Sequence, residues 1–292
     1  MGLSVFTHAI VATDLGPASE VIVACASTLR TLGVRHAVLV HVIDLEHTLS
    51  PGDDATFTRQ VTSLESAGIR VSVDTPFGYA AHAITEMAAK RGAGLIVMGT
   101  RGQGLFHIGF SGSVSSDVIR LSPVPVLLMS EAGTRTARGG AEACGRALAS
   151  VLLPTDFSAS ADRTFRLTCA LAPAGIDRLT IVHVIQSTFE ALRGGSECVA
   201  RDQLDALSAQ AREAGVADVR TEVAVGDPNR VIAKLTASDG YSMVILAPRC
   251  LDSIDQHFGS VTNAVIREST IPMLLTRWDT NRSATCAETR RA

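Results

Sequence analysis

Short apolar runs alternate with longer amphipathic segments along the chain, and the alternation occurs twice. The apolar runs of the first half are FTHAIVAT, HAVLVHVI, IRVSV, GLIVMG and PVPVLLM, and those of the second half are SVLLPT, RLTIVHVI, VRTEVAV, YSMVILA and IPMLLT. Such runs are typical of parallel strands covered by helices on both faces. Apolar residues at helical spacing predict first-half helices over residues 17–32, 54–67, 79–91 and 113–121. The element order predicts an α/β fold with two tandem doubly wound open-sheet domains, each with five mainly parallel strands.

The two halves are related by an internal duplication. The segment IVATDLGPASEVIVACASTLRTLGVRHAVLVHVI, which ends at Ile43, aligns without a gap with LLPTDFSASADRTFRLTCALAPAGIDRLTIVHVI, which ends at Ile185. Further on, GSVSSDVIRLSPVPVLLM aligns with GSVTNAVIRESTIPMLLT. A segment rich in Gly, Ala and Thr lies between the halves and is typical of a linker. We therefore expect a first domain over residues 1–132, a linker over 133–147, a second domain over 148–277 and a polar tail over 278–292.

Composition agrees with a two-domain globular protein and excludes some classes of partner. The chain has 292 residues, of which 46% are hydrophobic and 19% are charged, and a domain typically takes ~150 residues. A net charge of −3 provides no basic field, so nucleic acid is not an expected partner. No apolar stretch reaches the ~20 residues that span a bilayer, and the N-terminus lacks the pattern of a signal peptide. We expect no membrane partner and a cytoplasmic location.

The six cysteines are spread over different segments and form no CxxC pair. Neither a disulfide framework nor a zinc site is expected from this spacing. Reduced thiols fit the expected cytoplasmic location.

The most informative segment is VMGTRGQGLFHIGFSGSVSSDVIR, residues 97–120, which runs from the end of a predicted strand into a predicted helix. Glycines allow positive φ and close approach of the backbone to a ligand, and a helix N-terminus presents unpaired N–H groups. Together these features predict an anion site. The segment lacks the lysine of GxxxxGK[ST], and no GxGxxG follows the first strand, so a P-loop and a dinucleotide fingerprint are disfavoured. Taken alone, the glycines are also compatible with tight turns only, with Ser113 as an ordinary N-cap.

The spacing of these glycines is similar to a known motif. Gly99-x₂-Gly102-x₉-Gly112-Ser113 resembles the nucleotide-binding motif G-x₂-G-x₉-G-S/T of the universal stress protein family. The resemblance covers both halves, with ATD and PTD after the first strands, HVI at the second strands and GSV at the last helices. It implies a Rossmann-like fold of the adenine nucleotide alpha hydrolase type. It also implies ATP as the ligand, with Mg²⁺ accompanying the phosphates.

The resemblance implies a role for each matching position. In ATP-binding members, the turn after the first strand holds adenosine, the residue after the strand-two histidine contacts adenine, and the glycine motif surrounds ribose and phosphates. Carried onto this sequence, the implied cofactor-binding residues are Ala12, Thr13, Asp14, Val42, Met98, Gly99, Arg101, Gly102, Gly112, Ser113, Val114 and Ser115. Asp14 then supplies the polar side chain that contacts the ligand, and Arg101 adds a positive charge. The amides of residues 112–115 and the hydroxyls of Ser113 and Ser115 would donate to phosphate.

The second half departs from the motif. APRC at residues 247–250 stands where the first half has GTRG, and eight residues instead of nine separate Cys250 from Gly259. Pro248 removes an amide donor and fixes φ. We therefore expect one nucleotide site per chain, in the first half, with the second site degenerate or retaining only weak adenosine affinity.

Structural roles compete with functional ones at several polar residues. His41 recurs as His183 inside an apolar strand, which favours a structural histidine. The histidines match no standard metal-ligand spacing and no nucleophile motif is present, so we assign no catalytic and no metal-ligating residue. An aspartate after a strand commonly caps the next helix, and for Asp14 we weigh binding above capping, the two being compatible.

The leading hypothesis is an ATP-binding regulatory module of the stress response. Two alternatives stay open: a slow ATPase or autophosphorylating enzyme, and a nucleotide-independent protein-interaction module. The resemblance further implies an intramolecular pseudo-dimer of the two domains through their last strands. A homodimer of chains, an unknown protein partner, and the choice among ATP, AMP and cyclic AMP are left open by the sequence.

Overall fold

The structure is a computed structural model, which describes residues 5–43, 52–99, 114–129, 146–186, 195–238, 240–248 and 259–276. The elements of the first half are β1 (His8–Ala12), α1 (Pro17–Ala24), α2 (Ala26–Thr31), β2 (His36–Val40), α3 (Asp53–Ser66), β3 (Arg70–Asp74), α4 (Ala80–Lys90), β4 (Leu95–Gly99), α5 (Val114–Leu121) and β5 (Val126–Met129). Those of the second half are β6 (Ser150–Thr155), α8 (Ala159–Leu171), η1 (Ala172–Ala174), β7 (Arg178–Ile185), α10 (Gly195–Glu213), β8 (Asp218–Val225), α11 (Pro228–Thr236), β9 (Met243–Leu246), α12 (Ser260–Glu268) and β10 (Met273–Leu275). Residues 133–145 of the expected linker and the expected tail at 278–292 lie outside the described residues.

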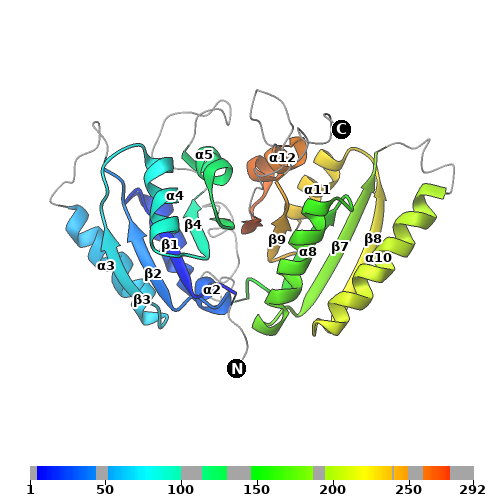
Figure 1. Ribbon diagram of the computed structural model, residues 1–292, viewed down its shortest axis with the longest axis horizontal. Helices are drawn as coiled ribbons and strands as arrows, with labels where there is room; N and C mark the ends of the chain where they lie inside the picture. The colour runs from blue at the N-terminus through cyan, green and yellow to red at the C-terminus, as the bar shows by residue number, and fades with distance from the viewer. Residues whose placement is uncertain are drawn as a thin grey trace, which may run out of the picture.

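The strands form one ten-stranded sheet in the order β3-β2-β1-β4-β5-β10-β9-β6-β7-β8 (Figure 1). Within each half the paired strands are parallel, which confirms the predicted α/β fold. In the first half the chain moves outward from β1 to β2 and β3 and then returns to β4 on the other side of β1. The strand order therefore reverses between β1 and β4, and at the equivalent place between β6 and β9. Ligands of open α/β sheets bind at the carboxyl ends of strands beside such a reversal.

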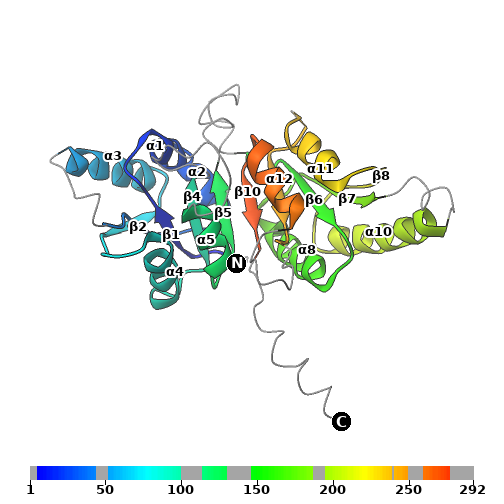
Figure 2. The same ribbon diagram turned by 90° about the horizontal axis from the view of Figure 1, so that it is seen from above.

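The two halves meet where β5 runs antiparallel to β10, with Leu274 opposite Leu127. Figure 2 shows these two strands side by side at the centre of the molecule. Both leucines are fully buried. Each half thus covers the edge strand of the other, which removes two unpaired sheet edges. The pairing of the last strands that the resemblance implied is therefore present within one chain.

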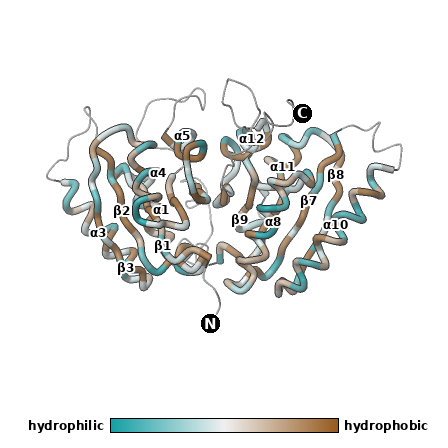
Figure 3. Tube along the Cα trace, in the orientation of Figure 1, coloured by the Kyte–Doolittle hydropathy of each residue, from teal (hydrophilic) through white to brown (hydrophobic). Residues whose placement is uncertain are grey.

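Helices cover both faces of the sheet, and alternate strand residues point to each face. In the first half, α1, α2 and α3 pack on the face that carries Val11 and Leu39, whereas α4 and α5 pack on the face that carries Ile10 and Val40. In the second half, α8 and α10 cover one face and α11 and α12 the other. Both hydrophobic clusters continue across the junction. Figure 3 shows hydrophobic residues along the strands and hydrophilic residues along outer helices such as α10.

The sequence predicted one helix over residues 17–32, and this prediction is wrong at one position. The helix is interrupted at Cys25, whose N–H donates to the Ile22 carbonyl at 3.1 Å, a spacing of three residues instead of four. Cys25 is buried and disulfide-bonded, whereas Cys169 and Cys198 are free. The expectation that all thiols are reduced is therefore corrected at Cys25.

In the part of the chain that the structure describes, no helix has both the length and the apolar character needed to cross a membrane.

Candidate functional site

The turn after β1 holds three of the predicted binding residues, Ala12, Thr13 and Asp14, at the carboxyl end of the strand. The Thr13 hydroxyl oxygen accepts a hydrogen bond from the Leu15 N–H at 3.0 Å, and Leu15 has a φ of +58°. Asp14 Oδ1 accepts from the Gly16 N–H at 2.9 Å and from the Ser19 hydroxyl. The Asp14 carboxylate therefore binds the first turn of α1, which is the capping role weighed against ligand binding. The turn is fixed by its own hydrogen bonds.

A histidine joins this turn to the neighbouring strand. His41 Nδ1 lies 3.0 Å from the Thr13 carbonyl oxygen, and His183 Nδ1 lies 2.9 Å from the carbonyl oxygen of Thr155 in the second half. The structural role predicted for both histidines is thereby confirmed. Val42 follows His41 beyond the end of β2 and is half-exposed. It lies two residues after Val40, which is opposite Ala12 at the carboxyl end of β1.

The end of β4 and the start of α5 form the other side of the site. The Ser115 hydroxyl donates to the Gly99 carbonyl at 3.1 Å, so that the first turn of α5 is held at the last residue of β4. Met98 is buried in the core, whereas Val114 is exposed. Because the Ser115 proton is engaged by Gly99, the amide of this residue is better placed than its hydroxyl to face an anion.

Four predicted site residues, Arg101, Gly102, Gly112 and Ser113, lie outside the described residues. The other eight lie at the carboxyl ends of β1, β2 and β4 and in the first turn of α5. Those strands are neighbours, since β1 pairs with both β2 and β4. The structure thus brings the eight described residues to the reversal of strand order.

Sequence reasoning missed a polar cluster at the same end of the sheet. The Tyr79 hydroxyl donates to Asp117 Oδ2, and Arg120 Nη2 donates to Asp117 Oδ1 at 2.5 Å. Asp117 is only 8% exposed although it lies in the first turn of α5. The hydrogen bond to Asp117 and partial burial raise the pKa of Tyr79 above its ordinary value. The sequence signal that could have indicated this cluster is Asp117 itself, an acidic residue inside the apolar pattern of a short helix.

Exposed aromatic side chains border this end of the sheet as well. Phe77, which pairs with Ile43 through an isolated bridge beyond β2, is 79% exposed, and Tyr79 is also exposed. Among the described residues, no group of three or more His, Cys, Asp or Glu side chains is arranged to hold a metal ion. The described part of the site is therefore polar and backbone-rich, without a preformed metal cluster.

The second half repeats the turn but lacks the acidic residue of α5. Thr155 Oγ1 accepts from the Phe157 N–H at 3.1 Å, and Phe157 has a φ of +59°, as Leu15 has in the first half. Ala264 stands at the position of Asp117, so the acidic residue of α5 has no counterpart in α12. Pro248 is buried after β9, and residues 249–258 lie outside the described part of the chain.

Comparisons with known proteins agree with the duplicated architecture. The model of the universal stress protein family matches twice, at residues 6–130 and 149–277. A universal stress protein from Archaeoglobus fulgidus DSM 4304 has a similar structure, with a TM-score of 0.67 and 21% identity over 95% of this chain and 98% of that one. A candidate universal stress protein from Pseudomonas aeruginosa UCBPP-PA14 has a TM-score of 0.66 and 14% identity over 93% of each chain. No curated protein matches the chain.

These identities are low, so the solved structures support the fold alone, whereas the two family matches together cover most of the sequence. The chain therefore belongs to the universal stress protein family, with two of its domains in tandem.

Proposed function

We propose that the first half binds ATP, with Mg²⁺ on its phosphates, and that the chain acts as a regulatory module of the stress response. One observation carries the proposal: the Ser115–Gly99 hydrogen bond holds the first turn of α5 against the end of β4, beside the reversal of strand order. A helix N-terminus in this position presents unpaired amides to an anion, and the positive end of its dipole favours negative charge. The glycine spacing from Gly99 to Ser113 leads into these amides.

The adenosine end of the ligand fits the opposite side of the site. Ala12 and Thr13 end β1, and the half-exposed Val42 offers backbone groups at the end of β2. The hydrogen bonds of Thr13, Asp14 and His41 fix this side before a ligand arrives. A rigid site loses less conformational entropy on binding, which favours affinity.

Binding regulates the protein if two states of the chain differ in their affinity for the nucleotide. We place this action in the cytoplasm, where ATP shifts a conformational equilibrium or an equilibrium with a protein partner. The sequence identifies no residue that must act as a base for the attack of water on the γ-phosphate, so we propose binding without rapid hydrolysis.

The experiment begins with protein purified without added nucleotide, whose bound ligands are extracted and identified by mass spectrometry. The stripped protein is then titrated with ATP and Mg²⁺ by calorimetry. We expect one site per chain, and we expect Gly102→Asp to abolish binding because a carboxylate in the glycine motif repels phosphate. Absence of both bound nucleotide and binding heat would favour the nucleotide-independent module, and release of ADP in the same sample would favour the ATPase.

The duplication supplies a matched pair of variants. Arg101 and Arg249 occupy the same position of the GTRG and APRC segments. Arg101→Ala removes one charged contact to phosphate and should weaken ATP binding about tenfold, which corresponds to ~1.4 kcal/mol. Arg249→Ala should leave the affinity unchanged. Equal losses in the two variants would contradict a single site in the first half.

A further inference from the structure

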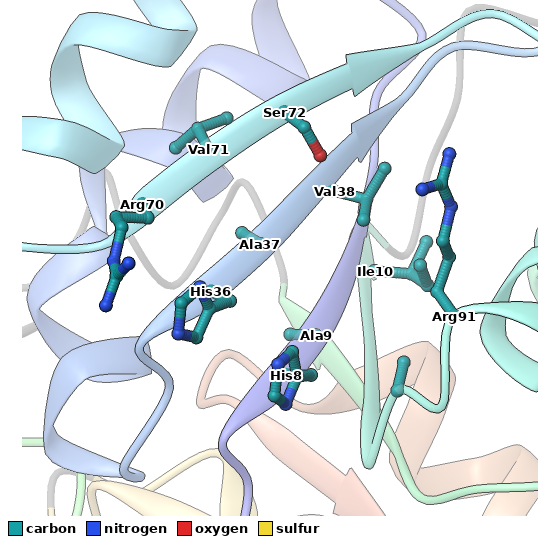
Figure 4. A pocket seen from close by; sticks show the side chains of 11 residues that line it. His8, Ala9, Ile10, His36, Ala37, Val38, Arg70, Val71, Ser72 and Arg91 are labelled. Carbon is teal, nitrogen blue, oxygen red and sulfur yellow. The ribbon is translucent and has the colours of Figure 1, made fainter.

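A hollow lies at the opposite end of the first-half strands from the proposed nucleotide site. It has a volume of about 280 Å³ and is lined by residues at the beginning of β1, β2 and β3 and by the segment that follows α4 (Figure 4). The lining face is the one on which α4 packs, but the helix covers it only in part, because Val38 is half-buried and Ser72 is exposed. The hollow is therefore open to solvent.

Three basic side chains cross the sheet in one row, which we call the His–Arg row: His8, His36 and Arg70. His8 is opposite His36 in the pairing of β1 with β2, and His36 is opposite Arg70 in the pairing of β2 with β3. Residues in register on neighbouring strands point to the same face. The rings of His8 and His36 stack with centroids 4.8 Å apart and planes 11° apart. Figure 4 shows the Arg70 guanidinium on the other side of His36.

The row contains no acidic side chain. In the part of the chain that the structure describes, no carboxylate forms an ion pair with Arg70. Asp74, further along β3 on the same face, is engaged by Arg91 at 2.9 Å. Partial burial lowers the pKa of His36 below its ordinary value, and the charges of Arg70 and His8 lower it further. Among the described residues, Arg70 and the two histidines of this row therefore have no carboxylate partner.

The second half places a carboxylate in the same row. Ser150, Arg178 and Asp218 are in register at the positions of His8, His36 and Arg70. Arg178 Nε donates to Asp218 Oδ2 at 2.7 Å, and Arg220 Nη2 donates to the same oxygen at 3.3 Å. Two cations therefore share an internal anion in the second half, whereas the first half has an arginine where that anion stands.

We propose that the His–Arg row binds a phosphate-bearing small molecule, whose oxyanion takes the place that Asp218 has in the second half. The imidazole N–H groups, the Arg70 guanidinium and the Ser72 hydroxyl are donors that line the same hollow, and charged donors form the strongest hydrogen bonds to phosphate. The half-buried Val38 also lines the hollow and provides apolar contact for the body of the molecule. This site is separate from the proposed nucleotide site and does not depend on it.

The test is an NMR titration of the histidine side chains with inorganic phosphate, at constant ionic strength set by chloride. The chain has eight histidines, and His36→Gln assigns the signal of His36. A bound oxyanion favours the imidazolium form, so saturating phosphate should raise the titration midpoint of His36 by about half a pH unit or more. Phenyl phosphate is titrated in parallel: tighter binding than inorganic phosphate identifies an organic phosphate as the ligand class, and equal binding identifies the free anion.

Variants at Arg70 separate a specific site from general charge effects. Arg70→Asp reproduces the row of the second half, so it should raise the His36 midpoint without phosphate and remove the response to phosphate. Arg70→Gln should weaken the response without supplying an anion, and it covers the case in which Arg70→Asp does not fold. Arg59→Asp makes the same change of net charge on exposed α3, away from the row, and should respond as the wild type does.

Three results would overturn the proposal. They are a wild-type midpoint that is the same in phosphate and chloride, a response that survives in both Arg70 variants, and a response that Arg59→Asp removes as completely as Arg70→Asp does.

Discussion

The two halves of the chain keep the contacts that hold the fold and differ in the contacts that surround ligands. Both halves have a residue with positive φ after the first strand, at Leu15 and Phe157, and both tie this turn to the second strand through a histidine. In contrast, the acidic residue Asp117 of α5 is an alanine in α12. A duplicated domain can lose a binding site without losing its fold, because the two depend on different residues.

The row at the other end of the strands shows the same divergence in charge. The first half has three basic side chains in this row, His8, His36 and Arg70, whereas the second half pairs Arg178 with Asp218. In the second half the charge of Arg178 is balanced by an ion pair within the chain. The first half has no carboxylate at the equivalent position, and an external anion can take that place; this difference supports the inference of a second site.

The largest expected effect is a loss of stability at the β5–β10 junction, where the two halves share a core. Leu127 and Leu274 are opposite each other across the β5–β10 junction and are fully buried. Each leucine-to-alanine substitution should lower the free energy of unfolding by about 2–5 kcal/mol, because it leaves a cavity in the shared core. Urea denaturation measures the loss. Val73→Ala on the exposed edge strand β3 is the control, with an expected change within about 0.5 kcal/mol.

The same experiment tests whether the junction couples the halves. If the halves were independent, Leu274→Ala would destabilise the second half alone, and unfolding would occur in two steps. A shared core predicts that both variants shift one common transition.

An intermediate effect is expected from alanine substitutions at the equivalent histidines His41 and His183, and the two variants should differ in ATP binding. Each loses one hydrogen bond to a carbonyl when replaced by alanine, which should cost about 1 kcal/mol of stability in either half. Only His41→Ala should also weaken ATP binding, by a factor of about 5, since Thr13 belongs to the proposed site. Calorimetry with ATP and urea denaturation give the two quantities. Equal effects of both substitutions on ATP binding would contradict the assignment of the site to the first half.

The smallest expected effect is the pH dependence of stability to which Asp218 contributes in the second half. Hydrogen bonds from Arg178 and Arg220 lower the pKa of Asp218 below its ordinary value of 3.8. A depressed pKa in the folded state contributes stability above pH 3.8, and this contribution is lost as the pH falls through the lower, folded-state pKa. Asp218→Asn should therefore be slightly less stable than the wild type at neutral pH and equally stable in strong acid.

The effect should be small because the carboxylate is exposed and screened by solvent. Urea midpoints measured from neutral to acidic pH would check it. Arg178→Gln should reduce the pH dependence in the same direction, and an unchanged profile in both variants would show that the pair adds no stability.

Local pattern and spacing in the sequence were sufficient for most of the fold. Apolar runs predicted the ten strands, since a buried strand must be apolar wherever helices cover both of its faces. The gapless repeat predicted that the halves share one topology. The break of the first helix at Cys25 was not predicted, because the apolar spacing continues through it and only the backbone geometry departs from the helix.

The sequence also suggested where a ligand would bind, and the structure adds contacts among the proposed site residues. The glycine spacing pointed to the end of β4 and the start of α5, and the family resemblance added the ends of β1 and β2. The engagement of Ser115 by Gly99 and of Asp14 by Ser19 was not readable from spacing, nor was the contact of Tyr79 with Asp117. Each joins groups whose distance depends on how two elements pack.

The sequence by itself determined the duplication, the order of strands and helices, and the half of the chain that retains the glycine motif, because these depend on periodicity and on the spacing of neighbouring residues. Only the tertiary structure decided which side chains meet across strands. The antiparallel β5–β10 junction and the alignment of His36 with Arg70 follow from register between strands far apart in the chain. Register is set by the packing of the whole sheet, and no local pattern encodes it.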